Sequence, residues 1–204
     1  MLESLLPFGY TIIVVDDGST DHTVKTVSDF PVLLIRHELN MGQGAALETG
    51  MEAARLMDAD FVVHFDGDGQ HDPADIENLL DPLRKNEADI IFGSRFLSRK
   101  ATGISFSRKI ILKAGRWINY IVTGILLTDT HNGLRALNKK ALYSVHFYQP
   151  GMAHASEILH VVKRKSLRYK EVPVLIRYTA YSKRKGQGIL NAVNILFHLL
   201  FKKN

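Results

Sequence analysis

The sequence predicts an α/β fold with a mostly parallel central sheet flanked by helices. Short apolar runs typical of buried strands alternate with helical stretches, and two acidic loops directly follow two of these runs. A length of 204 residues, with 46% hydrophobic and 23% charged side chains, suits one ordinary globular domain. We therefore expect a single domain over residues 1–204.

The first half of the chain predicts four strands, each a short apolar run that ends in a polar loop. They cover residues 11–15, 32–35, 61–65 and 88–92. The helices between them carry start signals: Ser19 or Thr20 is expected to cap the first, and Asp72-Pro73 is expected to begin the third. Strands that alternate with helices in this way are typical of parallel sheets.

The second half predicts fewer strands and longer polar segments. We expect a polar loop over 93–103, a long amphipathic helix over 105–126, a strand at 133–137, a helix at 156–165 and a strand at 172–177. A mainly apolar tail follows at 189–201 and is too short to span a bilayer. Since the N-terminus lacks the pattern of a signal peptide and the chain has no cysteine, we expect a cytoplasmic protein.

The two signs of charge are segregated along the chain. Residues 1–92 hold 18 acidic and 5 basic side chains, whereas residues 93–204 hold 3 acidic and 21 basic ones. An acidic half suits a metal site, and a basic half suits an anionic ligand or surface. An unevenly charged but merely solvated surface is the alternative.

Two carboxylate-rich loops lie where ligands bind in open α/β sheets, beyond the carboxyl ends of the strands. Asp16-Asp17 follows the first expected strand, and Asp66-x-Asp68 follows the third. The intervening glycine lets both carboxylates converge on one cation, and such oxygen ligands suit Mg²⁺ or Mn²⁺ together with substrate phosphates. A plain turn is the alternative, but the preceding strand and the following Gln70 favour the metal site.

A calcium-binding EF-hand loop is a second alternative for the same segment. The acidic and amide residues from Asp66 to Glu77 match its ligand positions. However, His71 stands where that loop requires glycine, and a strand instead of a helix precedes it. We therefore set the calcium loop aside.

Four motifs in order carry a family resemblance: Asp16-Asp17-Gly18-Ser19, Asn40-x-Gly42-x-Gly44, Asp66-Gly67-Asp68-Gly69-Gln70-His71 and Gly93-Ser94-Arg95-Phe96. Together they resemble the signature of the family 2 glycosyltransferases, which have the GT-A fold. Within that family the chain is most similar to the dolichyl- or polyprenyl-phosphate mannosyl- and glucosyltransferases. The similarity extends from about Tyr10 to Gly188.

The resemblance implies a donor site in the acidic half, over residues 1–92. The residues that match nucleotide-binding positions are Asp16, Asp17, Asn40, Gly42 and Asp66. Those that match the ligands of a divalent Mg²⁺ or Mn²⁺ ion are Asp66, Asp68 and Gln70. Helix capping and close backbone packing explain Asn40 and Gly42 almost as well.

The chemistry of the acceptor separates two versions of this function. A hydroxyl acceptor needs a general base, whereas a phosphate monoester is already anionic and needs cations that offset its repulsion from the donor. The resemblance places Arg95, Arg108 and Arg135 in the basic half, over residues 93–188, as candidates that grip an acceptor phosphate. Glu157 is a candidate base for a hydroxyl acceptor, although pairing or positioning is favoured. Asp68, Arg95 and Glu157 are thus the expected catalytic residues.

Two late segments are candidates for contact with the donor, by resemblance to the family, and with the membrane, by composition. Ser182, Lys183 and Lys185 lie in a loop similar to one that folds over the bound donor, and neighbouring glycines permit such motion. The amphipathic tail at 189–204 has lysines on both flanks and suits the interface of an anionic leaflet. Packing on its own domain or on a second subunit is an equal alternative for the tail.

One feature departs from the family pattern. Members normally begin with a strand and a Pro-x-Tyr-Asn-Glu-like segment, whereas this chain starts at about the helix that follows them, with Leu2, Leu5 and Leu6. Without that strand, part of the nucleotide-base pocket is missing and a sheet edge is expected to stay unpaired.

The resemblance therefore implies a metal-dependent inverting transferase that moves a hexose from a GDP- or UDP-sugar to a polyprenyl phosphate. It would act as a peripheral protein on the cytoplasmic face of the membrane, and a homo-oligomer is among the expected partners. Transfer to a saccharide hydroxyl in the cell envelope is the nearest alternative, and a non-catalytic nucleotide- or membrane-binding module is another. Nucleic-acid binding is not expected, because the basic residues form no recognition motif.

Overall fold

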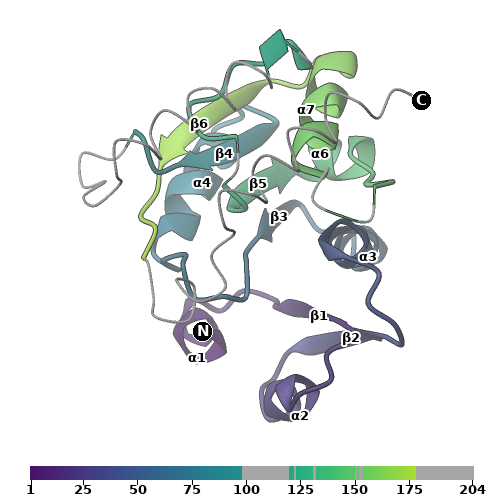
Figure 1. Ribbon diagram of the computed structural model, residues 1–204. Coiled ribbons are helices and arrows are strands. Elements are labelled where there is room, and N and C mark those ends of the chain that lie inside the picture. Colours follow the sequence, from purple (N-terminus) through teal and green to yellow (C-terminus); the bar gives the residue numbers. More distant parts are fainter. Residues whose placement is uncertain (98–119, 122, 131, 150, 152–153, 178–204) are drawn as a thin grey trace, which may run out of the picture.

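The computed structural model describes residues 1–97, 120–121, 123–130, 132–149, 151 and 154–177 (Figure 1). The elements follow in the order α1 (Leu2–Leu5), η1 (Leu6–Phe8), β1 (Ile13–Asp17), α2 (Thr23–Ser28), β2 (Leu33–His37), α3 (Gln43–Leu56), β3 (Phe61–His64), α4 (Asp75–Arg84), β4 (Ile90–Ser94), β5 (Arg135–Asn138), α6 (Lys139–Ser144), α7 (His154–Arg164) and β6 (Tyr169–Pro173). This alternation confirms the predicted α/β class.

The described strands form two sheets. β1 and β2 pair in parallel, with Ile13 opposite Leu33. The larger sheet has the order β3–β5–β4–β6, in which β4 and β6 are parallel and β5 runs antiparallel to both of its neighbours. The sheet is therefore mixed at β5, the strand that the second half of the chain inserts between β3 and β4.

The side chains of β1 and β3 point into the same two core clusters, although no ladder of backbone hydrogen bonds joins the two strands. Ile13 and Val62 pack against the core cluster formed with α3, α6 and α7. Their neighbours Ile12 and Val63 pack against the opposite cluster, formed with α4 and α1. Because successive side chains of a strand point to opposite faces, both strands belong to one layer that is interrupted between them.

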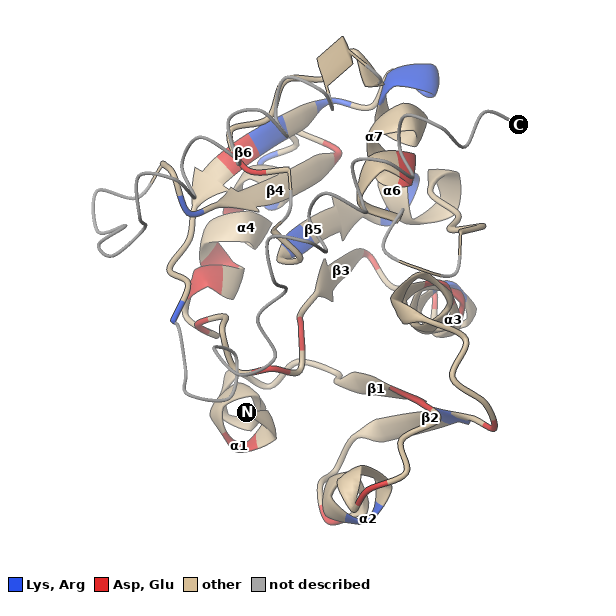
Figure 2. Cartoon of the chain, viewed as in Figure 1, with Lys and Arg blue, Asp and Glu red and all other residues tan. Residues whose placement is uncertain are grey.

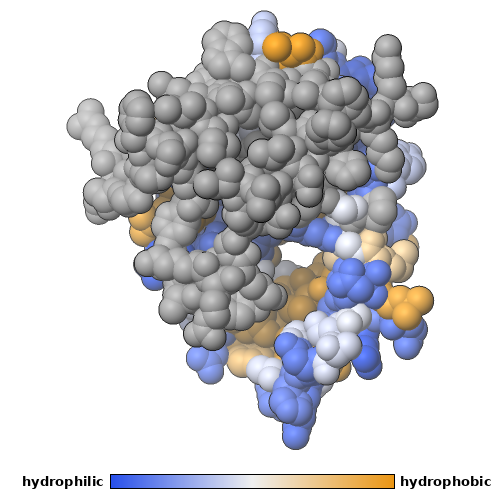
Figure 3. Space-filling model, in the orientation of Figure 1, coloured by the Kyte–Doolittle hydropathy of each residue, from blue (hydrophilic) through white to orange (hydrophobic). Residues whose placement is uncertain are grey.

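The interruption leaves apolar strand residues partly open. Phe61 at the start of β3 is 37% exposed, and Ile13, Val14 and Val15 of β1 are only half-buried. In the space-filling view the surface is hollowed in the region between β1 and β3, and apolar side chains line one side of the hollow (Figure 3). Within the described residues no strand pairs with the free edges of β1 and β3.

Arg55 attaches α3 to the rest of the domain. Its buried guanidinium donates from Nε to the Leu142 carbonyl at 3.0 Å and from Nη2 to the Val145 carbonyl at 2.5 Å. Nη1 contacts the carboxylates of Glu48 and Glu52 at 2.8 and 2.6 Å. A buried charge that is paired and hydrogen-bonded in this way is compatible with a stable core. The contacts fix α3, whose first residue reaches the candidate site described below.

Several boundaries differ from those predicted. β1 extends through Asp17 and β4 through Ser94, so Asp16, Asp17, Gly93 and Ser94 are strand residues and not loop residues. β5 starts two residues later than expected and β6 starts earlier, at Tyr169. Backbone pairing with β2 and β6 extends the strands past their apolar runs, which a sequence pattern does not reveal.

The predicted helix caps at Ser19 or Thr20 and at Asp72 are wrong. Asp21 Oδ1 accepts from the Thr23 N–H at 2.9 Å at the start of α2. Asp72 Oδ1 accepts from the Ala74 N–H at 3.1 Å in a turn, and α4 begins only at Asp75. α6 was not predicted; the Asn138 side chain caps it by accepting from the Ala141 N–H. Short polar side chains satisfy turns and helix ends alike, so the sequence did not distinguish these uses.

Most of the expected helix at 105–126 and the whole tail at 189–204 lie outside the described residues. Within the part of the chain that the structure describes, no helix is long and apolar enough to cross a membrane.

Candidate active site

The candidate metal-binding residues lie immediately beyond β3. The strand ends at His64, and Asp66, Asp68 and Gln70 follow in a turn in which Gly69 has φ +73°. Asp68 Oδ1 accepts from the Gln70 N–H at 2.9 Å, so the turn holds this carboxylate. In Figure 2 acidic segments lie beyond β3 and along α4, β5 carries a basic segment, and β6 and α7 carry both signs. Basic side chains of the second half pair with acidic ones of the first, as Arg168 does with Asp89 at 3.0 Å. The segregation of charge along the sequence is thus partly offset by ion pairs in the folded chain.

Asp66 is held from three directions. Gln43 of α3 donates to Oδ1 at 3.2 Å, and His71 Nε2 lies 3.3 Å from Oδ2. The backbone at Gly133, just before β5, approaches so closely that an added Cβ would lie 2.1 Å from Oδ2. Burial alone would raise the pKa of Asp66, but the His71 hydrogen bond and the charges of His71 and Arg135 outweigh it and lower the pKa. Asp66 is therefore an ionised and oriented carboxylate at neutral pH.

Asp17 uses both of its oxygens within the protein. Oδ1 lies 2.8 Å from His37 Nδ1 and accepts from the Met41 N–H, while Oδ2 accepts from the Gly42 N–H at 2.7 Å. Burial would raise the pKa of Asp17, but the His37 hydrogen bond and the two backbone N–H groups lower it below its usual value. Asp17 thus anchors the loop before α3.

Asp16 differs from its neighbour. It is buried, and Oδ2 accepts from the Ser19 N–H at 3.2 Å, but Oδ1 has no hydrogen-bond partner. An unpartnered buried carboxylate oxygen is costly unless a ligand donates to it. Of the acidic pair, Asp16 has the acceptor atom that a ribose or base could use.

The loop residues Asn40 and Gly42 lie at the N-terminus of α3. Asn40 is exposed, and Gly42 has φ +95° as the residue before the helix. The Asn40 backbone also approaches Gly18, where an added Cβ would lie 2.7 Å from the Asn40 nitrogen. The glycines therefore let the 16–18 and 40–42 segments meet, while a contact of Asn40 with a nucleotide stays a prediction.

Replacement of Asp17 by asparagine is expected to lower the free energy of unfolding by about 1–2 kcal/mol at pH 7, because an amide cannot accept at both oxygen positions. A lowered carboxyl pKa contributes stability that is present above the unfolded value of about 4 and is lost as the pH falls through the folded pKa. The difference between Asp17→Asn and wild type should therefore shrink below about pH 4 in urea unfolding measured across pH.

Asp29→Asn is the matched control, since Asp29 is an exposed carboxylate directly after α2. It should change stability by less than about 0.5 kcal/mol. An equal loss in both variants, or a loss in Asp17→Asn that does not depend on pH, would contradict this role.

Arg95 is held by an acidic network at the end of β4. Its backbone N–H and its Nε both donate to Asp129 Oδ2, the latter at 2.6 Å. Glu171 of β6 in turn accepts from the backbone N–H groups of Thr128 and Asp129. Asp129 and Glu171 were not predicted as site residues. Their scarcity was an available signal, since they are two of only three acids in residues 93–204.

Glu157, the third of these acids, lies on α7. Its Oε1 accepts from the Tyr148 N–H at 3.0 Å and its Oε2 from the Gln149 N–H at 3.2 Å. Glu157 therefore holds the 148–149 segment through the backbone N–H groups of that segment. The expected pairing of Glu157 with an arginine is not seen among the described residues.

Arg135 is buried at the start of β5, where its Nε donates to the Asn132 carbonyl at 3.3 Å. The predicted site residues Arg108, Ser182, Lys183 and Lys185 lie outside the described residues.

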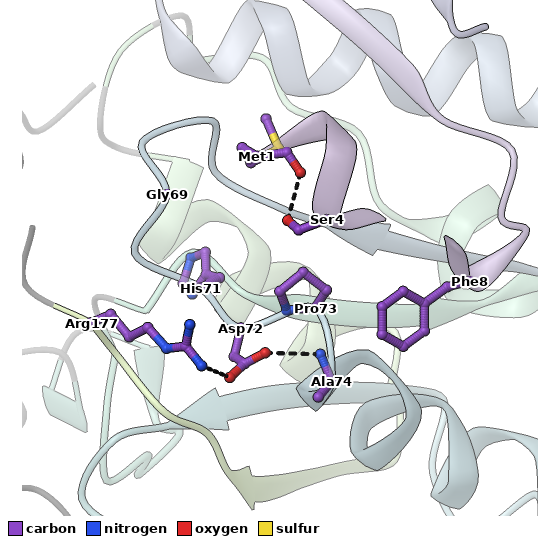
Figure 4. A pocket seen from close by; sticks show the side chains of 9 residues that line it. All are labelled: Met1, Ser4, Phe8, Gly69, His71, Asp72, Pro73, Ala74 and Arg177. Carbon is purple, nitrogen blue, oxygen red and sulfur yellow. Dashed lines mark hydrogen bonds and ion pairs between the residues drawn. The ribbon is translucent and has the colours of Figure 1, made fainter. Parts of the chain in front are cut away.

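A cavity of about 320 Å³ lies beside the turn that follows β3 and is lined in part by Gly69 and His71. Figure 4 shows it between α1 and the 69–74 segment, with Arg177 at its edge in an ion pair with Asp72 at 2.5 Å. His71, which contacts Asp66, lines this cavity, but none of the predicted site residues does. The cavity therefore adjoins the candidate site and is not its binding cleft.

The donor set fits a hard divalent cation whose shell is completed by a substrate. Two carboxylates and one amide follow β3 within five residues. Among the described residues, no group of three or more histidine, cysteine or acidic side chains is assembled to hold a metal by itself. Mg²⁺ and Mn²⁺ sites with one or two carboxylates plus substrate phosphates have this character.

Comparisons with known proteins identify the family of the chain. Residues 1–152 match the model of "Glycosyl transferase family 2". The chain is 32% identical to a UDP-N-acetylglucosamine–dolichyl-phosphate N-acetylglucosaminyltransferase of Methanococcus voltae, over 94% of this chain and 84% of that protein. It is also 32% identical to a dolichol-phosphate mannosyltransferase of Pyrococcus furiosus, over 97% of this chain and 57% of that one.

A solved structure shares the fold. Glucosyl-3-phosphoglycerate synthase from Mycobacterium tuberculosis, in complex with Mn²⁺, UDP and phosphoglyceric acid, superposes with a TM-score of 0.69 at 18% identity. The match covers 100% of this chain and 73% of that one. It confirms the expected GT-A fold.

Proposed function

This chain belongs to glycosyl transferase family 2, in its polyprenyl-phosphate branch, and we propose that it transfers a hexose from a nucleotide-diphospho-sugar to a polyprenyl phosphate. The observation that carries the choice of acceptor is the state of the three carboxylates in residues 93–204. Asp129, Glu157 and Glu171 all accept hydrogen bonds from backbone N–H groups. None is a free base, and a phosphate acceptor needs none.

The donor would be held by the acidic half. Asp66, Asp68 and Gln70 would bind Mg²⁺ or Mn²⁺, which would neutralise the diphosphate as the sugar leaves. Asp16 offers the unpartnered Oδ1 to the nucleoside, and Asp17 supports it by holding the 41–42 backbone in place. The likeness to a structure that contains Mn²⁺ and UDP supports this assignment at the level of the fold.

The acceptor phosphate would meet arginines fixed by the protein. Arg95 is oriented by Asp129, and Arg135 is buried beside Asp66 with an unpartnered Nη1. Preorganised cations of this kind offset the repulsion between two anionic substrates without reorganisation during the reaction. Arg108 and the loop residues Ser182, Lys183 and Lys185 are proposed to complete this binding.

A polyprenyl phosphate lies in a bilayer, so the proposed reaction requires peripheral contact with the cytoplasmic face of the membrane. The segment at 189–204 has the apolar and basic composition for that contact. Association into a homo-oligomer is a further proposal for the same tail.

The test of the proposed function is transfer of labelled sugar from GDP- and UDP-sugars to vesicles that contain undecaprenyl phosphate. We expect label in the organic-solvent extract only when the lipid phosphate, a divalent ion and the protein are all present. Vesicles without undecaprenyl phosphate are the control. Label that is transferred to a saccharide, and not to the lipid, would contradict the proposed acceptor.

Glu157→Gln distinguishes the two acceptor classes. For a phosphate acceptor the variant should keep activity within about threefold, because Glu157 only positions backbone groups and glutamine retains one acceptor oxygen. For a hydroxyl acceptor the loss of a general base should cost about 100-fold or more. The measurement is kcat/KM with each acceptor at saturating donor, with the melting temperature as the check on folding.

A non-catalytic binding module predicts a different result. Titration calorimetry with Mn²⁺ and GDP or UDP should detect binding if the chain is an enzyme with this donor site. Folded protein that binds neither nucleotide in the presence of Mn²⁺ would defeat the proposed function.

A further inference from the structure

Several side chains near Asp66 have buried polar atoms without the partners that such atoms require: His64 and His71 at Nδ1, and, with the least exposure, Asn132, Arg135 and His154. Asn132, Arg135 and His154 are 3%, 2% and 4% exposed. Asn132 Nδ2, Arg135 Nη1 and both ring nitrogens of His154 have no hydrogen-bond partner. We call these residues the inner polar cluster. Most buried polar atoms in folded proteins are paired, so several unpaired ones in one place indicate a missing ligand.

The fold brings the three residues together from two segments. Asn132 lies in the turn before β5, Arg135 is the first residue of β5, and His154 is the first residue of α7. Between Asn132 and Arg135 lies Gly133, whose backbone touches the Asp66 carboxylate. The cluster is therefore adjacent to the carboxylate that we assign to the metal.

The unpaired atoms call for an electron-rich ligand. Asn132 Nδ2 and Arg135 Nη1 are donors, and a neutral imidazole offers one further N–H. Burial lowers the pKa of His154 to about 4 and that of Arg135 to about 10, so at neutral pH the histidine is neutral and the arginine remains charged. Within the described residues no carboxylate lies at ion-pair distance from Arg135, although the charges of Asp66 and Asp129 act on it from further away.

A buried guanidinium without a contacting anion destabilises the protein that contains it. Such a group is retained where a ligand supplies the counter-charge. Asp66 and Asp129 are already engaged by His71 and Arg95, which leaves the Arg135 Nη1 position for an external anion.

We propose that Asn132 and His154 join Arg135, which the resemblance already assigns to the acceptor phosphate, in binding that phosphate group. This inference rests on the proposed function for the identity of the ligand, but the anion site itself does not depend on catalysis. The acceptor phosphate then lies on the β5 side of Asp66, and the nucleotide lies on the β1 side, next to Asp16.

The first experiment measures anion binding without turnover. The melting temperature of the full chain should rise with the concentration of farnesyl phosphate, a short prenyl phosphate, and the rise should be lost in Arg135→Met. Without ligand, Arg135→Met should melt at or above the wild-type temperature, because the variant removes an unpaired buried charge. A clear fall in its melting temperature, with the response to farnesyl phosphate retained, would show that Arg135 is structural and would overturn the proposal.

The second experiment separates the acceptor from the donor. His154→Ala and Asn132→Ala should each raise the acceptor KM about tenfold or more, as expected for a lost hydrogen bond to a charged group, and should leave the affinity for GDP or UDP within about twofold. His154→Gln, which keeps a donor, should restore part of the loss. His160→Ala, an exposed histidine on the same helix, is the control and should change neither value.

The outcomes separate the two proposals. If nucleotide affinity falls and the acceptor KM does not, the cluster serves the donor diphosphate and the acceptor assignment is wrong. If neither value changes in folded variants, there is no anion site. If farnesyl phosphate binds through the cluster but no sugar is transferred, the anion site stands and the proposed function fails.

Discussion

Asp68→Asn is expected to lower the rate of sugar transfer about a thousandfold while the protein stays folded. Asparagine keeps the size of the side chain but removes the charge that attracts a divalent cation, and the metal stabilises the charge that develops on the diphosphate. Stability should change little, since Asp68 is half-buried and its hydrogen bond to the Gln70 N–H needs only one oxygen. The measurements are kcat/KM, Mn²⁺ affinity in the presence of nucleotide, and the melting temperature.

Asp60→Asn is the matched control for this prediction, because Asp60 is an exposed carboxylate next to the other end of β3. It should retain nearly normal kcat/KM and Mn²⁺ affinity. Near-normal activity of Asp68→Asn would remove Asp68 from the metal site. An equal loss in both variants would mean that the effect arises from net charge and not from the metal.

The sequence located the carboxylate turn after β3 because all of the information for that turn is local. An apolar run, two aspartates and two glycines within nine residues suffice to predict a strand that ends in a carboxylate turn. The same reasoning did not reveal that Asp16 and Asp17 have different roles, one with an unpartnered oxygen and the other bonded within the protein. Their difference depends on His37 and the 41–42 backbone, which are 20 to 25 residues away and meet Asp17 only in the folded chain.

The network that orients Arg95 lay beyond sequence reasoning for the same reason. Glu171 meets Thr128, and Asp129 meets Arg95, only because β4, β6 and the turn before β5 converge. The inner polar cluster is also non-local, and it is defined by the absence of partners, which no motif records. What sequence did provide was the scarcity of acids in the second half, and all three of them proved to hold loops in place.

The fold class was predictable from alternation, whereas the order and continuity of the sheet were not. Strand patterns do not say that β5 enters antiparallel between β3 and β4. Nor do they predict the break between β1 and β3, across which no ladder forms within the described residues. The half-exposed apolar residues along β1 and at Phe61 are the physical consequence of that break.

Gly133→Ala is expected to lower kcat/KM about 100-fold with little loss of stability. The added methyl carbon would lie 2.1 Å from Asp66 Oδ2 and 2.8 Å from its Cγ, distances that real Cβ atoms do not show. Because the obstructing atoms belong to the end of a side chain, the carboxylate can turn away without unfolding the domain. A displacement of about 1 Å at a reacting centre is enough to cost about 100-fold in rate.

Gly67→Ala provides the comparison that isolates this effect. Gly67 lies between Asp66 and Asp68, yet the nearest atom to an added Cβ is the Met1 Cε at 3.8 Å, so a methyl group there meets only ordinary contacts. We expect Gly67→Ala to retain most of its activity and Mn²⁺ affinity, although Gly67 lies nearer in sequence to both carboxylates proposed to bind the metal. Which of the two variants loses more activity therefore tests whether the orientation of Asp66 depends on the backbone before β5. If Gly67→Ala were the more damaged enzyme, the flexibility of the turn, and not the contact with Gly133, would govern the position of the carboxylate.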